Sequence, residues 1–391
     1  MQRSFIARNP SVLIFLSILA VFTLGVTILS EGVGIGAIST SFVKVLGKTL
    51  CLCLIAIAMD LIWGYMGVLS LGHFAFFGLG GYMVGMWLMY ERTRQIVESA
   101  LSEGVLPPTA EEITAGIGNQ IFGVVGSSDF PLIWAFADSL ALQLAFVVLV
   151  PGSLALVFGW LAFRSRVTGV YLSILTQAMT LGLSLYLFQN ASGLRGNNGL
   201  SGLQNLPGVT APQSVVSLWF FWASALALGL GYLLVAWVVS GKFGSVIRGI
   251  RDNEARVRFL GYSVETYKLA VFTLTACISG IAGALYYPQA GIINPAEVAP
   301  IASIYLAVWV AIGGRGRLYG AVIGTAFVSL VSSWFTGGQA PDVPLGFYTV
   351  KWVDWWLVLL GLSFVLVTLY APNGIGGLID LLKRTRKGTD A

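Results

Sequence analysis

Charged residues are scarce in this chain of 391 residues: 10% are Asp, Glu, Lys or Arg, whereas 57% are hydrophobic. A water-soluble domain carries about 25% charged residues. A helix that crosses a bilayer needs roughly 20 apolar residues, so the chain has room for about ten such helices. No interval between its apolar segments exceeds roughly 40 residues, the lower limit for a domain that folds unaided. The composition excludes a soluble enzyme and predicts a single transmembrane domain over residues 1–391.

Residues that bind metals or form disulfides are also few. Cys51, Cys53 and Cys277 lie in apolar segments without metal-ligand spacing, and His73 is the only histidine. With no histidine cluster and no paired carboxylates, we expect neither an enzyme active site nor a metal or cofactor in this chain. The basic residues are scattered over short loops and form no continuous basic face, so nucleic acid is not an expected partner.

The apolar segments alternate with short loops. Under a cytoplasmic N-terminus, 16 of the 22 Lys and Arg residues fall on the cytoplasmic side, as the positive-inside rule requires. This predicts an all-α polytopic membrane protein with both termini cytoplasmic. The loops 91–131 and 190–215 then face outward into the periplasm. The first segment could instead be a cleaved signal peptide, but its apolar run is long for one. The ten predicted spans are residues 12–30, 49–66, 68–90, 134–161, 167–189, 216–240, 267–290, 299–314, 318–336 and 353–372.

Glycine pairs spaced four residues apart occur inside the spans, for example Gly81 with Gly85 and Gly320 with Gly324. Such pairs let helix backbones approach closely, so we expect tight helix packing at these positions.

The longest cytoplasmic loop, residues 241–266, has the pattern of a short amphipathic helix. Apolar residues recur at mostly helical spacing between Ser245 and Leu260, among charges of both signs. A helix of this kind cannot span a bilayer. It lies on the membrane or docks into a partner, unless the segment is only a solvated connector.

Three separated runs carry a resemblance to a known family. The stretch from Gly241 to Tyr287 resembles the cytoplasmic coupling loop and following helix of the branched-chain amino acid family of ABC importer permeases. Residues 61–82 and 313–325 look like the early and late signatures of the same family. Three shorter runs are similar to its urea-transport branch: Asp60 with LIWGY, SILTQA over 173–178, and NNGLSGL over 197–203.

The resemblance implies an importer built from two different permease subunits, two cytoplasmic ATPases and an external, periplasmic substrate-binding protein in a bacterial inner membrane. This chain would be one permease, and ATP and Mg would bind to the ATPases. The fragment Gly47, Lys48, Thr49 is not an ATP site, because Phe42 stands where a phosphate-binding loop needs its first glycine. By the same resemblance, the residues that dock into the ATPase are Arg251, Asp252, Glu254 and Gly261.

Asp60 and His73 are candidates for a gate. A carboxylate inside a span costs about 2.5 to 3.5 kcal/mol on insertion scales and is by default a functional hypothesis. If the second and third spans turn near Gly67, both side chains lie roughly 10 Å deep and can pair. The alternative is that each satisfies backbone groups at a turn weakened by glycine.

Three amide side chains are candidates for the translocation pathway. Gln177 lies within a span, where it either contacts the solute or joins two helices by a hydrogen bond. Asn197 and Asn198 lie on the outer loop 190–215, where they either shape the entrance or belong to a flexible connector.

The sequence therefore predicts a permease subunit of an ATP-driven importer for urea, with branched-chain or other amino acids as the alternative. A proton-coupled transporter would need several acids near the midplane together with broken helices in matching halves. A passive channel would have no use for a coupling loop.

Overall fold

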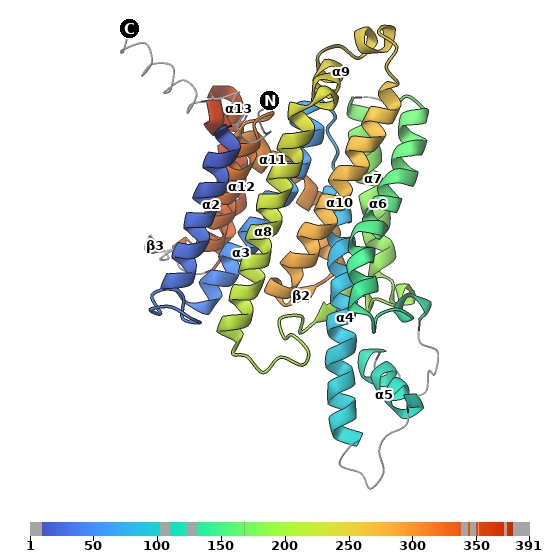
Figure 1. Cartoon of the computed structure of the whole chain (residues 1–391), viewed down its shortest axis with the longest axis vertical. Helices are drawn as coiled ribbons and strands as arrows, with labels where there is room; N and C mark the ends of the chain where they lie inside the picture. Colours follow the sequence, from blue (N-terminus) through green and yellow to red (C-terminus); the bar gives the residue numbers. More distant parts are fainter. Residues whose placement is uncertain are drawn as a thin grey trace, which may run out of the picture.

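The computed structural model describes residues 10–101, 110–122, 131–167, 169–337, 343–344, 349–350, 352–370 and 374–377. Helices make up most of this part of the chain and strands very little of it, in agreement with the predicted all-α class (Figure 1). The α-helices are α2 (Pro10–Leu29), α3 (Thr40–Asp60), α4 (His73–Leu101), α5 (Ala110–Phe122), α6 (Leu140–Arg164), α7 (Val170–Phe188), α8 (Gln213–Ser240), α9 (Lys242–Phe259), α10 (Val264–Ala290), α11 (Pro300–Gly313), α12 (Leu318–Thr336) and α13 (Trp352–Tyr370).

Short elements connect these helices. The π-helix η1 (Leu61–Tyr65) continues α3, and the 3-10 helices are η2 (Leu132–Trp134), η3 (Asn190–Ser192), η4 (Gly196–Asn198) and η5 (Pro295–Val298). Two antiparallel strand pairs complete the described structure. They are β1 (Leu200–Ser201) with β2 (Ile292–Ile293), and β3 (Val343–Pro344) with β4 (Thr349–Val350).

Each of the ten predicted spans coincides with a helix. In the described residues, seven helices are long and apolar enough to cross a membrane: α2, α3 with η1, α6, α7, α8, α10 and α12. Helix α11 has only 14 residues and is about 21 Å long, shorter than the roughly 30 Å hydrocarbon core. It is therefore a partial span.

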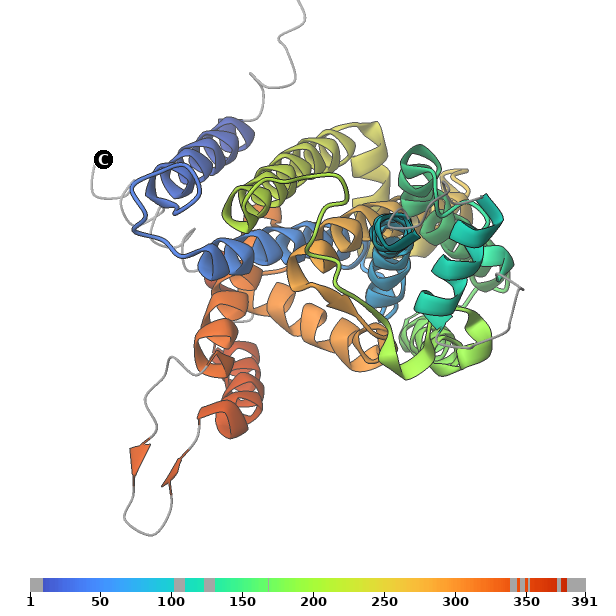
Figure 2. The same ribbon diagram turned by 90° about the horizontal axis from the view of Figure 1, so that it is seen from below.

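Helix α3 forms the centre of the bundle. In its most apolar window 89% of the residues are buried, against 17% in α2, because α8, α10 and α12 pack around it (Figure 2). Polar side chains on its surface pair with neighbouring helices, as Thr49 does with Ser329 of α12 at 3.0 Å between hydroxyl oxygens. Such contacts hold helices together where lipid supplies no hydrophobic driving force.

Close backbone contacts between glycines join α11 to α12. A Cβ atom at Gly324 would overlap the backbone of Gly313, and one at Gly320 would press on the carbonyl oxygen of Gly313. The close packing predicted for Gly320 and Gly324 is confirmed, and it holds the partial span α11 against a full one.

The bundle has two distinct ends. Helix α9, the start of α2 and the end of α13 lie at one end, called here the α9 end (Figure 1). Helix α5 and the β1–β2 pair lie toward the other, called here the α5 end. The first and the last spanning helices thus reach the end that holds the amphipathic helix α9, and residues 1–9 and 378–391 at the two termini lie outside the described part.

Two boundaries differ from the predicted ones. The outer loop expected over 91–131 is largely helical, because α4 continues to Leu101 and α5 follows at Ala110. Residues 102–109 and 123–130 of that loop lie outside the described part. The predicted turn near Gly67 is a longer, irregular segment over residues 66–72.

Candidate coupling and gating site

The chain between α3 and α4 is not helical throughout. After Asp60 it forms the π-helix η1, and residues 66–72 then run without regular structure, with Gly67 at a φ of +78°. Isolated π-helical turns occur frequently at functional sites. Irregular backbone is tolerated at membrane depth only where protein or a water-filled cavity surrounds it. We call η1 with residues 66–72 the α3–α4 junction.

Asp60 anchors this junction to the turn between α11 and α12. Its carboxylate is fully buried, and its Oδ1 accepts a hydrogen bond of 2.7 Å from the backbone N–H of Gly316. A Cβ atom at Gly64 would overlap both Oδ1 of Asp60 and the nitrogen of Gly316, so only glycine fits there. The guanidinium of Arg315 lies 4.8 Å from the ring centroid of Trp63 and supplies positive charge nearby.

His73 is not the partner of Asp60. It begins α4 and is fully buried, and among the described residues no hydrogen bond or ion pair joins its ring to Asp60. Its nearest aromatic contact is edge-on to Phe76, with ring centroids 6.2 Å apart. The predicted Asp60–His73 pair is therefore wrong, although both residues border the same junction.

Hydroxyls of α7 satisfy the backbone of the junction. Ser173 Oγ donates to the carbonyl oxygen of Leu69 at 2.8 Å, and the N–H of Leu71 donates to Thr176 Oγ1 at 3.0 Å. Gln177 makes neither contact. The relevant signal in the SILTQA run is thus the pair of hydroxyls three residues apart, which share one helix face.

The predicted amphipathic helix is present as α9, but it is kinked. Asn253 has extended backbone with a φ of −160°, and its Oδ1 accepts a hydrogen bond of 3.0 Å from the N–H of Arg256. Asn253 therefore ends one helical segment and caps the next. Gly261, at a φ of +89°, makes the turn from α9 toward α10.

Arg251 lies before the kink and reaches the junction. Its Nη1 donates to the carbonyl oxygen of Gly64 at 2.9 Å, and its Nε pairs with Asp252 Oδ1 at 3.0 Å. The backbone of Gly67 packs directly against the Arg251 side chain. Arg251 thus contacts the α3–α4 junction while 40% of its side chain stays exposed, and its contact with a partner stays a prediction.

The segment after the kink is tied to α10 by ion pairs. Glu254 pairs with Lys268 at 2.7 Å and with Arg258 at 3.0 Å, and Arg258 also pairs with Glu265 at 2.8 Å. Lys268 is buried, so its link to Glu254 is the least screened of the three. Glu254 thus connects α9 to a spanning helix.

Three apolar or aromatic side chains at the end of α9 face solvent. Phe259, Leu260 and Tyr262 are 92%, 71% and 44% exposed. We call these three residues the α9 tip. Only Leu260 belongs to the predicted amphipathic pattern, although three large side chains in four residues beside a turn glycine are a visible signal in the sequence.

The outer candidates lie toward the opposite end. Asn197 and Asn198 are exposed on η4, directly before β1, whose pairing with β2 fixes the loop against the chain that precedes α11. Three of the predicted site residues, Asp60, His73 and Arg251, lie at the junction or contact it, whereas Asn197 and Asn198 are apart from it.

Residues 41–368 match the family described as branched-chain amino acid transport system, permease component. The chain belongs to this family. The permease protein LivM of the high-affinity branched-chain amino acid transport system of Escherichia coli K12 is 21% identical over 360 residues, which are 86% of this chain and 70% of LivM. The LivM protein of Salmonella typhimurium matches equally.

A second kind of relative in this permease family matches over a shorter stretch. The autoinducer 2 import system permease protein LsrC of Escherichia coli O9:H4 is 30% identical over 105 residues, 25% of this chain and 31% of LsrC. No solved structure is significantly similar to this chain. As its relatives are transport permeases, the protein is a multi-pass membrane permease of an ABC-type transporter.

Proposed function

We propose that this permease is one of two different permease subunits in an ATP-driven importer of the bacterial inner membrane. Two cytoplasmic ATPases bind ATP and Mg, and a periplasmic binding protein delivers the solute at the α5 end. One observation carries the proposal: an amphipathic helix with an exposed apolar tip is hydrogen-bonded through Arg251 to the α3–α4 junction.

Force passes from the ATPase to the junction in three steps. The α9 tip docks into an apolar groove of the ATPase, with Asp252, Glu254 and Gly261 beside it. Movement of the tip bends α9 at Asn253 and pulls on α10 through the Glu254–Lys268 pair. Arg251 transmits the shift to Gly64, and Asp60 passes it to the α11–α12 turn through Gly316.

The junction acts as the gate in this proposal because its backbone is held by contacts that can exchange. The carbonyl groups of Gly64 and Leu69 and the N–H of Leu71 bond to Arg251 and to α7 hydroxyls. The buried hydroxyl of Ser70 in the junction has no hydrogen-bond partner among the described residues, so it is available to a solute or to a rearranged junction, and His73 is buried next to it.

We propose urea as the solute. The proposal rests on the three runs that resemble the urea-transport branch. The first forms the junction, the second lies on the α7 segment that contacts the junction, and the third includes η4 and β1 at the outer loop. Leu200 and Leu203 from the third run approach α4 at Gly85, which connects the outer loop to the helix that begins at the junction.

Branched-chain amino acids are the second candidate, supported by the name of the LivM relative and by two opposite charges. Lys48 of α3 and Glu297 of η5 are both partly buried, and no ion pair joins them in the described structure. Two separated charges suit the carboxylate and ammonium groups of an amino acid, whereas urea has no charge to match.

Uptake by vesicles that hold the complete importer tests the proposal and separates the two solutes. Labelled urea and labelled leucine are supplied with the binding protein, with ATP inside. The proposal predicts uptake of urea, unchanged by Glu297→Gln. Uptake of leucine alone, reduced by Glu297→Gln, establishes the second candidate, and uptake without any ATPase subunit contradicts the importer.

A further inference from the structure

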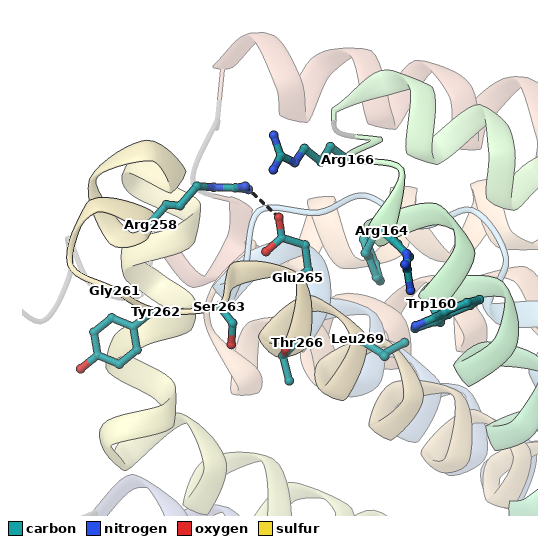
Figure 3. A pocket seen from close by; sticks show the side chains of 11 residues that line it. Trp160, Arg164, Arg166, Arg258, Gly261, Tyr262, Ser263, Glu265, Thr266 and Leu269 are labelled. Atoms are coloured by element: carbon teal, nitrogen blue, oxygen red, sulfur yellow. Dashed lines mark ion pairs between the residues drawn. The ribbon is translucent and has the colours of Figure 1, made fainter.

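A basic cleft opens at the α9 end of α6, beside the turn from α9 to α10 (Figure 3). Its volume is about 680 Å³, and it is distinct from the α3–α4 junction. Three arginines line it, Arg164 and Arg166 from the end of α6 and Arg258 from α9, with the single acid Glu265 from α10.

Two of these arginines, Arg164 and Arg166, form no ion pair in the described residues. Arg258 is paired with Glu265 at 2.8 Å, but no ion pair joins Arg164 or Arg166 to a carboxylate in the residues described. Figure 3 shows the side chains of Arg166 and Arg258 converging on Glu265 from opposite sides. Arg166 holds this place with a left-handed backbone, at a φ of +54°, which is uncommon for a residue other than glycine. The cleft therefore has an excess of positive charge.

The cleft lies where a spanning helix meets the membrane surface. Arg164 is the last residue of α6, and its guanidinium lies 5.1 Å from the ring centroid of Trp160, one turn deeper. Trp160, Val157 and Leu161 are exposed, and most of α6 is unburied, so this side of the helix faces lipid. Tryptophan and arginine are typical of the interface between headgroups and acyl chains.

Three features identify what binds in the cleft: its positive charge, its position at the membrane surface, and the stripe of exposed apolar residues of α6 that adjoins it. We propose that the cleft binds the phosphate group of an anionic phospholipid, with the acyl chains along the exposed stripe of α6. Basic pockets between spanning helices on the cytoplasmic side are suited to such headgroups. The phosphate accepts hydrogen bonds from Arg164 and Arg166, and it competes with Glu265 for Arg258.

A lipid bound here affects the coupling helix. Arg258 lies in the segment after the Asn253 kink, whereas Arg164 and Arg166 belong to the end of α6 and the turn that follows. A phosphate between them adds a link from α6 to the part of α9 that carries the tip. The lipid composition of the membrane then sets how firmly this segment is held.

Native mass spectrometry of the purified full chain tests the site. The chain is titrated with phosphatidylglycerol, with phosphatidylcholine of the same acyl chains, and with inorganic phosphate. We expect phosphatidylglycerol to bind at least about tenfold more tightly than phosphatidylcholine, and Arg164→Gln with Arg166→Gln to remove this preference. Lys242→Gln with Arg256→Gln removes the same charge at the same end but outside the cleft, and it should keep the preference.

Three outcomes overturn the proposal. The first is equal binding of the two lipids, and the second is an equal loss of the preference for phosphatidylglycerol in the cleft variant and its control. The third is displacement of phosphatidylglycerol by millimolar inorganic phosphate. The last identifies a site for a free anion instead of a lipid. Arg164→Lys with Arg166→Lys retains the charge and should retain the preference, which separates loss of the site from misfolding. The test involves no ATPase, so its failure leaves the proposed import function untouched.

Discussion

The guanidinium of Arg251 in α9 donates a hydrogen bond of 2.9 Å to the backbone carbonyl of Gly64, 187 residues earlier in the chain. Gly64 belongs to the π-helical turn that continues the most buried helix of the bundle. A helix at the surface is thereby joined directly to the place where the central helix loses its regular structure. This contact is the basis of the coupling mechanism proposed here.

Replacing Gly64 by alanine should disrupt the junction. The added Cβ would overlap Asp60 Oδ1 and the nitrogen of Gly316, and overpacking of this kind typically costs about 1 to 3 kcal/mol. We expect a lower melting temperature and loss of transport. Gly182→Ala in α7 is the matched control, because a Cβ atom there would meet nothing within 4 Å. Equal effects of the two substitutions would contradict the account.

The α7 hydroxyls should matter more than the amide beside them. Thr176→Val leaves the buried N–H of Leu71 without its acceptor, which costs about 1 to 3 kcal/mol. Gln177→Leu breaks no contact with the junction. Thermal denaturation in detergent should show a clearly lower melting temperature for Thr176→Val and a small change for Gln177→Leu. The reverse order would favour Gln177 as the functional residue.

Asp60 and His73 should act independently. Because they share no contact, the changes in unfolding free energy for Asp60→Asn and His73→Asn should add within about 0.5 kcal/mol in the double variant. Asparagine at position 60 can still accept the hydrogen bond of Gly316, so the single variant should fold. A coupling energy above about 1 kcal/mol between the two substitutions would support the gate in which Asp60 pairs with His73.

The α9 tip should contribute to ATPase binding. Phe259→Ser with Leu260→Ser removes two large apolar side chains from a predicted interface, and loss of one strong contact costs about 2 kcal/mol, or roughly 30-fold in affinity. Affinity for the ATPase is measured by titration of the purified subunits. Val33→Ser with Ile35→Ser, equally exposed at the α5 end, is the control and should leave binding unchanged.

The sequence predicted those features of the fold that depend on residues close together in the chain. The hydropathy of each span fixed its helix, the spacing of charged and apolar residues located α9, and the glycine pair of α12 predicted its contact with α11. Asp60 was identified as a site residue because a carboxylate in a span is costly wherever its partner lies.

The details that failed depend on residues distant in the chain. The junction is irregular because Gly316, Ser173, Thr176 and Arg251 supply its hydrogen bonds from three other parts of the sequence. Nothing near Gly67 encodes those partners. For the same reason Asp60 was paired with a nearby histidine instead of a backbone N–H 256 residues away, and the contact of Arg251 with Gly64 was not anticipated.

Hydrolysis of ATP and uptake of solute, measured together in vesicles that hold the complete importer, test the central claim that Arg251 links α9 to the junction. The comparison is between the unaltered chain and Arg251→Ala, with Arg256→Gln as a control for lost charge. A hydrogen bond from a charged group is worth about 1.5 to 3 kcal/mol. We therefore predict that Arg251→Ala lowers uptake per ATP hydrolysed by roughly tenfold or more while ATPase binding persists. An unchanged ratio of uptake to hydrolysis would contradict the account.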